Sequence, residues 1–294
     1  MIFDRELIRR RRRRAAALGP ATFLLDRVAP DLVERLAVVL RRFDLAVDLA
    51  TPSDAVRAAL AGVDSVGTIV AASAISNRTA RRENLVITDE EALPFRDSSL
   101  DLVVSALALQ FVNDLPGVLV QIRRALRPDG LFLGALLGGE TLTELRQSFA
   151  AAESEIEGGA SPRVAPFADL RELGALLQRA GFALPVTDVD RLTVRYDTPL
   201  SLMYDLRRMG ATNALYARRR APLRRTTLIR MAEIYGARFA DDDGRLRATF
   251  DIVWLSGWAP HPAQQQPLKP GTAKARLADA LGTREMSIRE KAGR

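Results

Sequence analysis

Short, almost wholly apolar runs alternate with longer segments of helical periodicity along most of this sequence, and this alternation restricts the fold more than any other feature. Each run has strand length and is too continuously apolar for one face of an amphipathic helix, which is typical of strands buried on both faces. Strands that alternate with helices predict parallel βαβ units and a doubly wound α/β sheet. The expected strands occupy residues 45–49, 66–72, 85–88, 100–104 and 131–136.

Helical segments are predicted between and after these strands. An aliphatic stripe at helical spacing runs from Leu115 to Leu126 and ends before the Pro128-Asp129-Gly130 turn. Thr141 and Glu144 have the three-residue spacing of a capping box, which predicts a helix from about residue 142. A further helix is expected to stop at Gly181. The remaining expected elements are strands at 192–196 and 248–258 and helices at 200–217 and 226–239.

Composition limits the chemistry that the chain can carry. Cysteine is absent and His261 is the single histidine among 294 residues, which excludes a thiolate zinc site or a two-histidine iron site built from the chain's own residues. No signal-peptide pattern follows Met1, so we expect a cytoplasmic protein. The expected organisation is a basic helical arm over residues 1–43, a main domain over 44–258 with a helical insert at about 198–240, and a mostly disordered tail over 259–294.

Positive charge is concentrated near the start of the chain. Arg5 and the run 9–14 supply seven arginines against only Asp4 and Glu6, within a formal net charge of +7 for the whole chain. Such an arm could contact anionic lipid, nucleic acid or an acidic partner surface. Neither interleaved aromatic residues nor a nucleic-acid motif accompanies the run, which favours an ordinary solvated helix and argues against nucleic acid as a partner.

Ligands of open α/β sheets bind beyond the carboxyl ends of the strands, so the loops at those ends are the candidate sites. The first loop, residues 48–54, contains Asp48 and Ala50 but no glycine, although nucleotide-binding turns use glycine for close approach and positive φ. Pro52 restricts this loop further. The spacing alone favours an ordinary strand-to-helix turn capped by Thr51 or Ser53 over a ligand site in this loop.

The next three loops offer fewer or different polar groups. Ser73 follows the second strand, where nucleoside-binding enzymes place an acid for the ribose hydroxyls. Asp89 and Glu90 follow the third strand, where a carboxylate can accept from the exocyclic amine of a purine or can simply cap a turn. Ser105 opens an apolar fourth loop that could form a pocket wall. No nucleophile and base stand at a telling spacing, so no catalytic residue is assigned.

A set of motifs resembles the methyltransferase-like complex I assembly factor described as an arginine hydroxylase, and behind it the BioC-type class I methyltransferases. The resemblance extends over nearly the whole chain up to Trp258. The Gly-Gly-Glu-Thr-Leu and Glu-Gly-Gly stretches are the most particular to the assembly factor. The matching residues are 2–5, 89–91 with 93–95, 102–105, 112–116, 126–130, 138–142 with 144–146, 157–159 with 161–162, and 179–182.

The resemblance implies a Rossmann-like class I methyltransferase fold with a seven-stranded mixed sheet, helices on both faces and a helical insert before the last strand. It also implies S-adenosylmethionine over the first three strand ends, with Asp89 near the adenine. Two departures affect this site: the family's Asp-Leu-Gly-Cys-Gly continues here as Ala50-Thr51-Pro52, and Ser73 replaces the ribose acid. The candidate cofactor-binding residues are Asp48, Ala50, Ser73, Asp89, Glu90 and Ser105.

Two functions follow from the resemblance. The first is an S-adenosylmethionine-dependent enzyme, a methyltransferase or a protein-arginine hydroxylase, that modifies a respiratory complex I subunit or a small substrate. The second is a non-catalytic complex I assembly factor with a degenerate cofactor site, in which the arginine arm binds an acidic partner. In both cases the arginine-rich start could place the protein at the periphery of the inner membrane, and no metal is expected.

Overall fold

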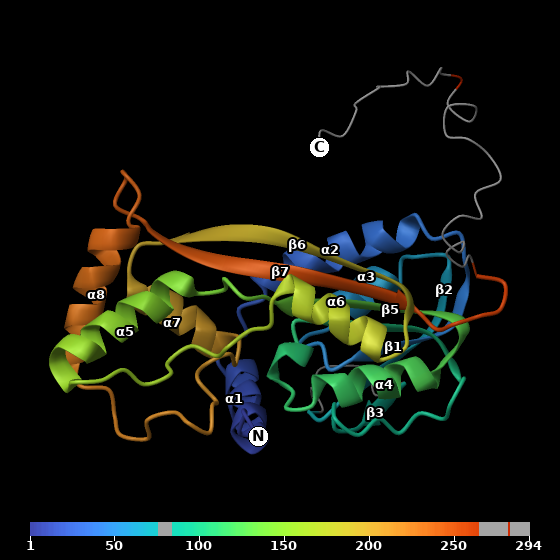
Figure 1. Cartoon of the computed structure of the whole chain (residues 1–294), viewed down its shortest axis with the longest axis horizontal. Coiled ribbons are helices and arrows are strands. Elements are labelled where there is room, and N and C mark those ends of the chain that lie inside the picture. Colours follow the sequence, from blue (N-terminus) through green and yellow to red (C-terminus); the bar gives the residue numbers. More distant parts are fainter. Residues whose placement is uncertain (76–83, 265–281, 283–294) are drawn as a thin grey trace, which may run out of the picture. The chain divides into compact units, whose positions relative to one another are not determined.

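A seven-stranded sheet forms the centre of the unit that spans Met1–Pro260 in the computed structural model, which describes residues 1–75, 84–264 and 282 (Figure 1). The elements are α1 (Arg5–Ala17), α2 (Phe23–Ala37), β1 (Phe43–Leu49), α3 (Ala55–Leu60), β2 (Val66–Ser73), β3 (Leu85–Ile87), β4 (Leu100–Ala106), a 3-10 turn (Leu109–Phe111), α4 (Leu115–Ala125), β5 (Leu126–Leu137), α5 (Thr143–Glu157), α6 (Leu170–Arg179), β6 (Ala183–Tyr196), α7 (Pro199–Arg208), α8 (Arg225–Phe239) and β7 (Leu246–Trp258).

The strand order is β3-β2-β1-β4-β5-β7-β6. Strands β1 to β5 are parallel, whereas β7 runs antiparallel to both β5 and β6. The order reverses between β1 and β4, because the chain moves outward through β2 and β3 and then returns to the other side of β1. This mixed sheet confirms the predicted class I methyltransferase fold, and its switch point lies at the carboxyl ends of β1 and β4.

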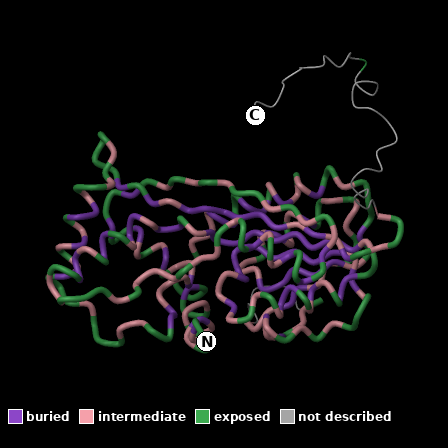
Figure 2. The backbone as a smooth tube through the Cα atoms, viewed as in Figure 1, coloured by how far each residue is buried: buried purple, intermediate pink, exposed green. Residues whose placement is uncertain are grey.

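Helices cover both faces of the sheet. Buried side chains of α2, α3, α5 and α8 pack on one face, and those of α4 and α6 pack on the other. Figure 2 shows that the buried backbone follows the strands, as expected for a sheet enclosed between two helical layers. Helix α2 packs against the sheet through Leu24, Val28, Leu32 and Leu36. Within residues 1–43 the basic run therefore belongs to α1, and α2 is part of the folded core.

The strand that closes the sheet, β6, is much longer than the predicted 192–196 segment. It begins at Ala183 and alternates half-buried and exposed residues over most of its length. Acids such as Asp188 and Asp190 interrupt the apolar pattern, because β6 is an edge strand with one face towards solvent. An apolar run therefore identifies only the end of this strand.

The first helix of the insert, α7, ends at Arg208 rather than at residue 217. Gly210 adopts a positive φ of 70° and its amide donates to the Arg207 carbonyl, while the next amide, of Ala211, donates to Leu206. This pattern ends a helix in the manner of a Schellman motif. The segment that follows carries buried Ala214 and Leu215, and Leu215 pairs with Phe3 in a β-bridge.

The predicted capping box at Thr141 and Glu144 is wrong, although α5 does begin at residue 143. The Glu144 carboxylate accepts from the Thr249 amide at 3.0 Å, and the Thr141 hydroxyl accepts from the Asp251 amide at 3.1 Å. Both side chains bind β7 instead of the helix start. Tertiary contacts have thus replaced the local cap.

The predicted domain limits stay predictions. The insert between β6 and β7 contains α7 and α8 within the expected 198–240 range. Most of the tail expected over 259–294 lies outside the described residues.

Candidate functional site

A cavity of about 900 Å³ opens at the switch point of the sheet. Its walls come mainly from three parts of the chain: the strand-end loops of β1, β2 and β4, the C-terminal half of α1 with the start of α2, and the end of α7 with the residues that follow it. Single residues of α3, β3 and β5 complete the lining: Arg57, Leu85 and Leu137. A volume of this size lies within the range of small-molecule and cofactor sites. The glycine-free first loop has therefore not filled the cleft with its own side chains.

The turn after β1 takes the conformation that glycine normally provides. Ala50 has a φ of 61°, is 1% exposed, and donates its amide to the Ala72 carbonyl at 2.7 Å. The left-handed region costs an L-residue about 1–2 kcal/mol, so the surrounding bonds must hold Ala50 in place. One of them runs from the Ala106 amide to the Thr51 hydroxyl at 3.1 Å, which ties the turn to the end of β4.

Asp48 is a buried carboxylate in the cavity wall. Its side chain is 3% exposed, it accepts from the Thr51 hydroxyl, and the Arg57 Nε lies 3.6 Å away. Burial raises the pKa of Asp48 to about 7, although the Thr51 bond and Arg57 act in the opposite direction. A carboxyl group that titrates near neutrality can bind a cationic ligand group as the anion or donate a proton as the acid.

The wall at the end of β2 is neutral. Ala71, Ala72 and Ser73 line it, and the Ser73 hydroxyl accepts from the Ile75 amide at 3.2 Å. Gln110 also lines the cavity, and its buried Oε1 has no hydrogen-bond partner among the described residues. An unpaired buried carbonyl oxygen is costly and marks a position where a ligand donor would be stabilised. Sequence reasoning missed Gln110, although it is the one polar residue between Ser105 and Val112 in an otherwise apolar loop.

The acidic loop after β3 contacts arginines of α1. Arg5 reaches Asp89 at 2.6 Å and Glu91 at 2.8 Å, and also pairs with Glu90. Arg9 binds the second Asp89 oxygen at 2.5 Å. Partial burial opposes ionisation of Asp89, but the Glu91 amide and the two arginines lower its pKa overall. Asp89 and Glu90 are absent from the described cavity lining, so their role as cofactor contacts stays a prediction.

Ser105 also lies outside the lining of the cavity. Its side chain is buried, and its hydroxyl donates to the Leu49 carbonyl at 2.8 Å. This bond joins β4 to β1 beside the switch point. Three predicted site residues, Asp48, Ala50 and Ser73, therefore lie together in the cavity wall, whereas Asp89, Glu90 and Ser105 serve contacts between elements.

Four arginines also line the cavity: Arg12 and Arg13 from α1, Arg57 from α3, and Arg208 from the end of α7. Arg12 pairs with Glu90 at 3.2 Å. The ion pairs that fix α1 therefore also fix the Arg12 guanidinium in the cavity wall. The basic run was a visible sequence signal, but its spacing gave no indication that α1 lies over the strand ends.

Residues 1–75, 84–264 and 282 contain no group of three or more His, Cys, Asp or Glu side chains arranged to hold a metal ion. None of the helices there is both long and apolar enough to span a bilayer.

Comparison with known proteins adds independent findings. A family model described as a methyltransferase domain matches residues 47–134. The arginine-hydroxylase NDUFAF5 of Danio rerio mitochondria is 38% identical over 286 residues, covering 95% of this chain and 89% of that protein. The malonyl-[acyl-carrier protein] O-methyltransferase of Laribacter hongkongensis is 41% identical over 192 residues, covering 65% and 62% of the two chains.

Among solved structures, the YcgJ protein of a Bacillus species superposes with a TM-score of 0.52 at 15% identity, covering 79% of this chain and 99% of that one. Identity this low supports the shared fold and nothing further.

Proposed function

The chain belongs to the NDUFAF5 arginine-hydroxylase family, and from this premise we propose that it binds S-adenosylmethionine in the switch-point cavity and modifies an arginine of a respiratory complex I subunit. The observation that carries the proposal is the open cavity of about 900 Å³ beside a buried carboxylate at the end of β1. If the protein had kept the fold but lost ligand binding, larger side chains could have filled this cavity.

Three polar groups of the wall suit the cofactor. The Asp48 carboxylate would attract a cationic group of S-adenosylmethionine, and the Ser73 hydroxyl and the Gln110 Oε1 would contact its neutral polar groups. When bound, the cofactor supplies an activated methyl group. Ala50 adds a single methyl to a turn that already has the glycine-like backbone, so the loss of glycine narrows the cavity without closing it.

The target is proposed to be a protein arginine because the family relatives carry that activity in their name. The cavity lining also contains Asp54, which pairs with Arg57 but keeps about half of its side chain exposed, so that an incoming guanidinium could approach it. Exclusion of water would fall to α1, which covers one side of the cavity. Hydroxylation requires an oxidant in addition to these residues, whereas methylation requires only the cofactor.

Calorimetric titration with S-adenosylmethionine tests the first half of the proposal. We expect saturable binding that Asp48→Ala weakens, because a buried charged contact is lost. Glu6→Gln is the control, since Glu6 is exposed, is absent from the described cavity lining and loses only a distant 4.0 Å pair with Arg10. No heat from the unchanged protein at millimolar cofactor would contradict the proposal.

The second half is tested on a complex I subunit incubated with the protein and cofactor, in parallel without and with dioxygen and a two-electron reductant. Mass spectrometry of its arginine-containing peptides should show the mass gain of CH2 for methylation, or of one oxygen atom in the mixture that contains the oxidant. The two masses distinguish methylation from hydroxylation. An unchanged arginine with cofactor bound would contradict the activity but not cofactor binding.

A non-catalytic assembly factor is the second candidate. The specific observation that favours it is the engagement of Asp89, Glu90 and Glu91 by α1 arginines, together with Ser73 in place of the ribose acid. This candidate predicts a stable complex with the subunit without cofactor binding. The same titration therefore separates the two.

A further inference from the structure

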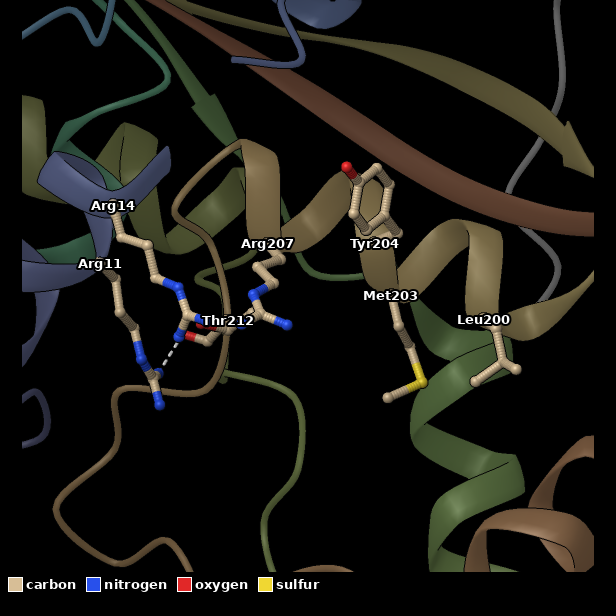
Figure 3. A pocket seen from close by; sticks show the side chains of 7 residues that line it. All are labelled: Arg11, Arg14, Leu200, Met203, Tyr204, Arg207 and Thr212. Atoms are coloured by element: carbon tan, nitrogen blue, oxygen red, sulfur yellow. Dashed lines mark hydrogen bonds between the residues drawn. The ribbon is translucent and has the colours of Figure 1, made fainter. Parts of the chain in front are cut away.

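A second hollow of about 530 Å³ lies on the other side of α1 from the cavity. It is bounded by Arg11 and Arg14 of α1, by Leu200, Met203, Tyr204 and Arg207 of α7, and by Thr212 beyond α7. Figure 3 shows the arginines gathered at one end of the hollow and the apolar side chains along α7 at the other. We call this hollow the α1–α7 groove.

The charge of the groove is unbalanced. Arg11 donates to the Thr212 carbonyl at 2.7 Å and also to that of Asn213, so its guanidinium is fixed in place. Arg14 and Arg207 are exposed and have no side-chain partner within the described part of the chain, and no carboxylate lies in the described lining. Each stands in the last turn of its helix, where the helix dipole stabilises a cation without using its N–H donors.

The apolar side of the groove is exposed although α7 already buries its opposite face. Leu202 and Leu206 are in the core, whereas Leu200 is 57% and Tyr204 is 54% exposed. Leu200, Met203 and Tyr204 have the three- and four-residue spacing that places side chains on one helix face. Met203 is half-buried and packs against the core, and the Arg208 guanidinium lies 5.7 Å from the centre of the Tyr204 ring. Leu200 and Tyr204 nevertheless keep more than half of their surface exposed beside the hollow, which is typical of a binding surface.

We propose that the α1–α7 groove binds an acidic segment of a partner protein, with carboxylates paired to Arg14 and Arg207 and an apolar side chain seated against Leu200 and Tyr204. The planar guanidinium of an arginine can donate two parallel hydrogen bonds to one carboxylate. The concave apolar wall can accommodate an apolar side chain of the partner. A flat membrane surface would contact neither the hollow nor its concave apolar wall.

The position of the groove connects this proposal to the proposed function, on which it rests in part. Arg12 and Arg13 of α1 line the cavity while Arg11 and Arg14 line the groove. Beyond α7, Met209 and Ala211 line the cavity while Thr212 lines the groove. The two hollows thus share one wall, and a segment held in the groove would belong to the same protein that presents its arginine to the cavity.

The test uses the full chain and a fluorescein-labelled synthetic peptide of glutamates interspersed with leucines and one phenylalanine. Fluorescence anisotropy should show binding that weakens as salt rises. The variant Arg14→Glu/Arg207→Glu should weaken it about tenfold or more, because two charge-assisted contacts become repulsive. The control Arg171→Glu/Arg179→Glu makes the same change in net charge at exposed positions of α6 and should have little effect.

Two further arms complete the design. Leu200→Ser removes an exposed apolar contact without a core cost and should weaken peptide binding several-fold. Calorimetric titration with S-adenosylmethionine should be unchanged in the groove variants, because neither arginine lines the cavity. If the unchanged protein does not bind the cofactor, the proposed function is refuted and the groove proposal still stands.

Three outcomes would overturn the groove proposal. The first is a peptide with glutamine in place of glutamate that binds equally well. The second is peptide binding that the α6 control pair reduces as much as the groove pair, which would indicate a general charge effect. The third is no peptide binding together with binding to phosphatidylglycerol vesicles that the groove pair abolishes, which would assign the surface to lipid.

Discussion

At the scale of single residues, Asp48 makes stability depend on pH. Its pKa is raised to about 7 by burial, above the usual value of 3.8. For an acid with a raised folded-state pKa, the stabilising contribution is full below the unfolded-state pKa and is lost as pH rises through the folded-state value. Ionised Asp48 therefore destabilises the protein above neutrality unless a cation binds beside it.

We expect Asp48→Asn to remove this penalty. The gain in the free energy of unfolding over the unchanged protein should grow between about pH 4 and pH 7 and then level off, reaching on the order of 4 kcal/mol. Denaturant unfolding at a series of pH values measures it. A difference between the two proteins that stays constant with pH would show that Asp48 is ionised or neutral throughout.

Ala50 is the second residue whose role can be isolated. Ala50→Gly removes the cost of the left-handed conformation, which exceeds the added chain entropy of glycine, so we expect stabilisation by up to about 1 kcal/mol. Ala72→Gly, in the neighbouring strand, is the control and should destabilise by about 0.5–1 kcal/mol. Thermal unfolding of both variants checks the pair, and a loss of stability in Ala50→Gly would contradict a strained turn.

At the scale of elements, the ion pairs of α1 with the loop after β3 hold that helix over the strand ends. Glu90 is buried and accepts from both Arg5 and Arg12. Glu90→Gln leaves these two guanidiniums without their shared anion, so we expect α1 to detach more often. Trypsin, which cleaves after arginine, should then cut the run 9–14 several-fold faster than in the unchanged protein.

Glu6→Gln is the matched control for this cleavage, because it changes an exposed acid of the same helix. High salt should accelerate cleavage of the unchanged protein and bring it closer to Glu90→Gln, because the screened ion pairs weaken. Equal cleavage rates in the two variants would show that apolar contacts such as those of Ile8 and Ala15 fix α1 without the ion pairs.

Elements stabilised by burial of their own apolar residues could be predicted from the sequence, whereas elements stabilised by contacts with distant residues could not. The central strands β1, β4 and β5 are buried over most of their length, so continuous apolar runs revealed them. Strands β2 and β3 are more exposed, but their apolar runs were long enough to reveal them, and the fold followed. The edge strand β6 and the start of α5 depend on tertiary pairing, with Thr141 and Glu144 bound to β7. For the same reason the pairing of Arg5 with Asp89, more than eighty residues away, left no local pattern.

At the scale of the whole molecule, the cavity exists only because distant parts of the chain meet. Its lining joins the end of α1 and the start of α2, the loops of β1, β2 and β4, and the end of α7 with Met209 and Ala211. The sequence showed the loop that lacks glycine, but it could not show that a left-handed Ala50 keeps the space open. A ligand in this cavity would touch all three parts and should stabilise them together.

Hydrogen exchange with and without S-adenosylmethionine tests that coupling. We expect slower exchange of backbone amides in the last turn of α1 and at the start of α2, because Ala15 and Leu24 line the cavity from these elements. The remote helix α8 contributes no residue to the described lining and serves as the internal control. Equal slowing in α8 would indicate global stabilisation, and unchanged α1 amides at saturating cofactor would place the ligand elsewhere.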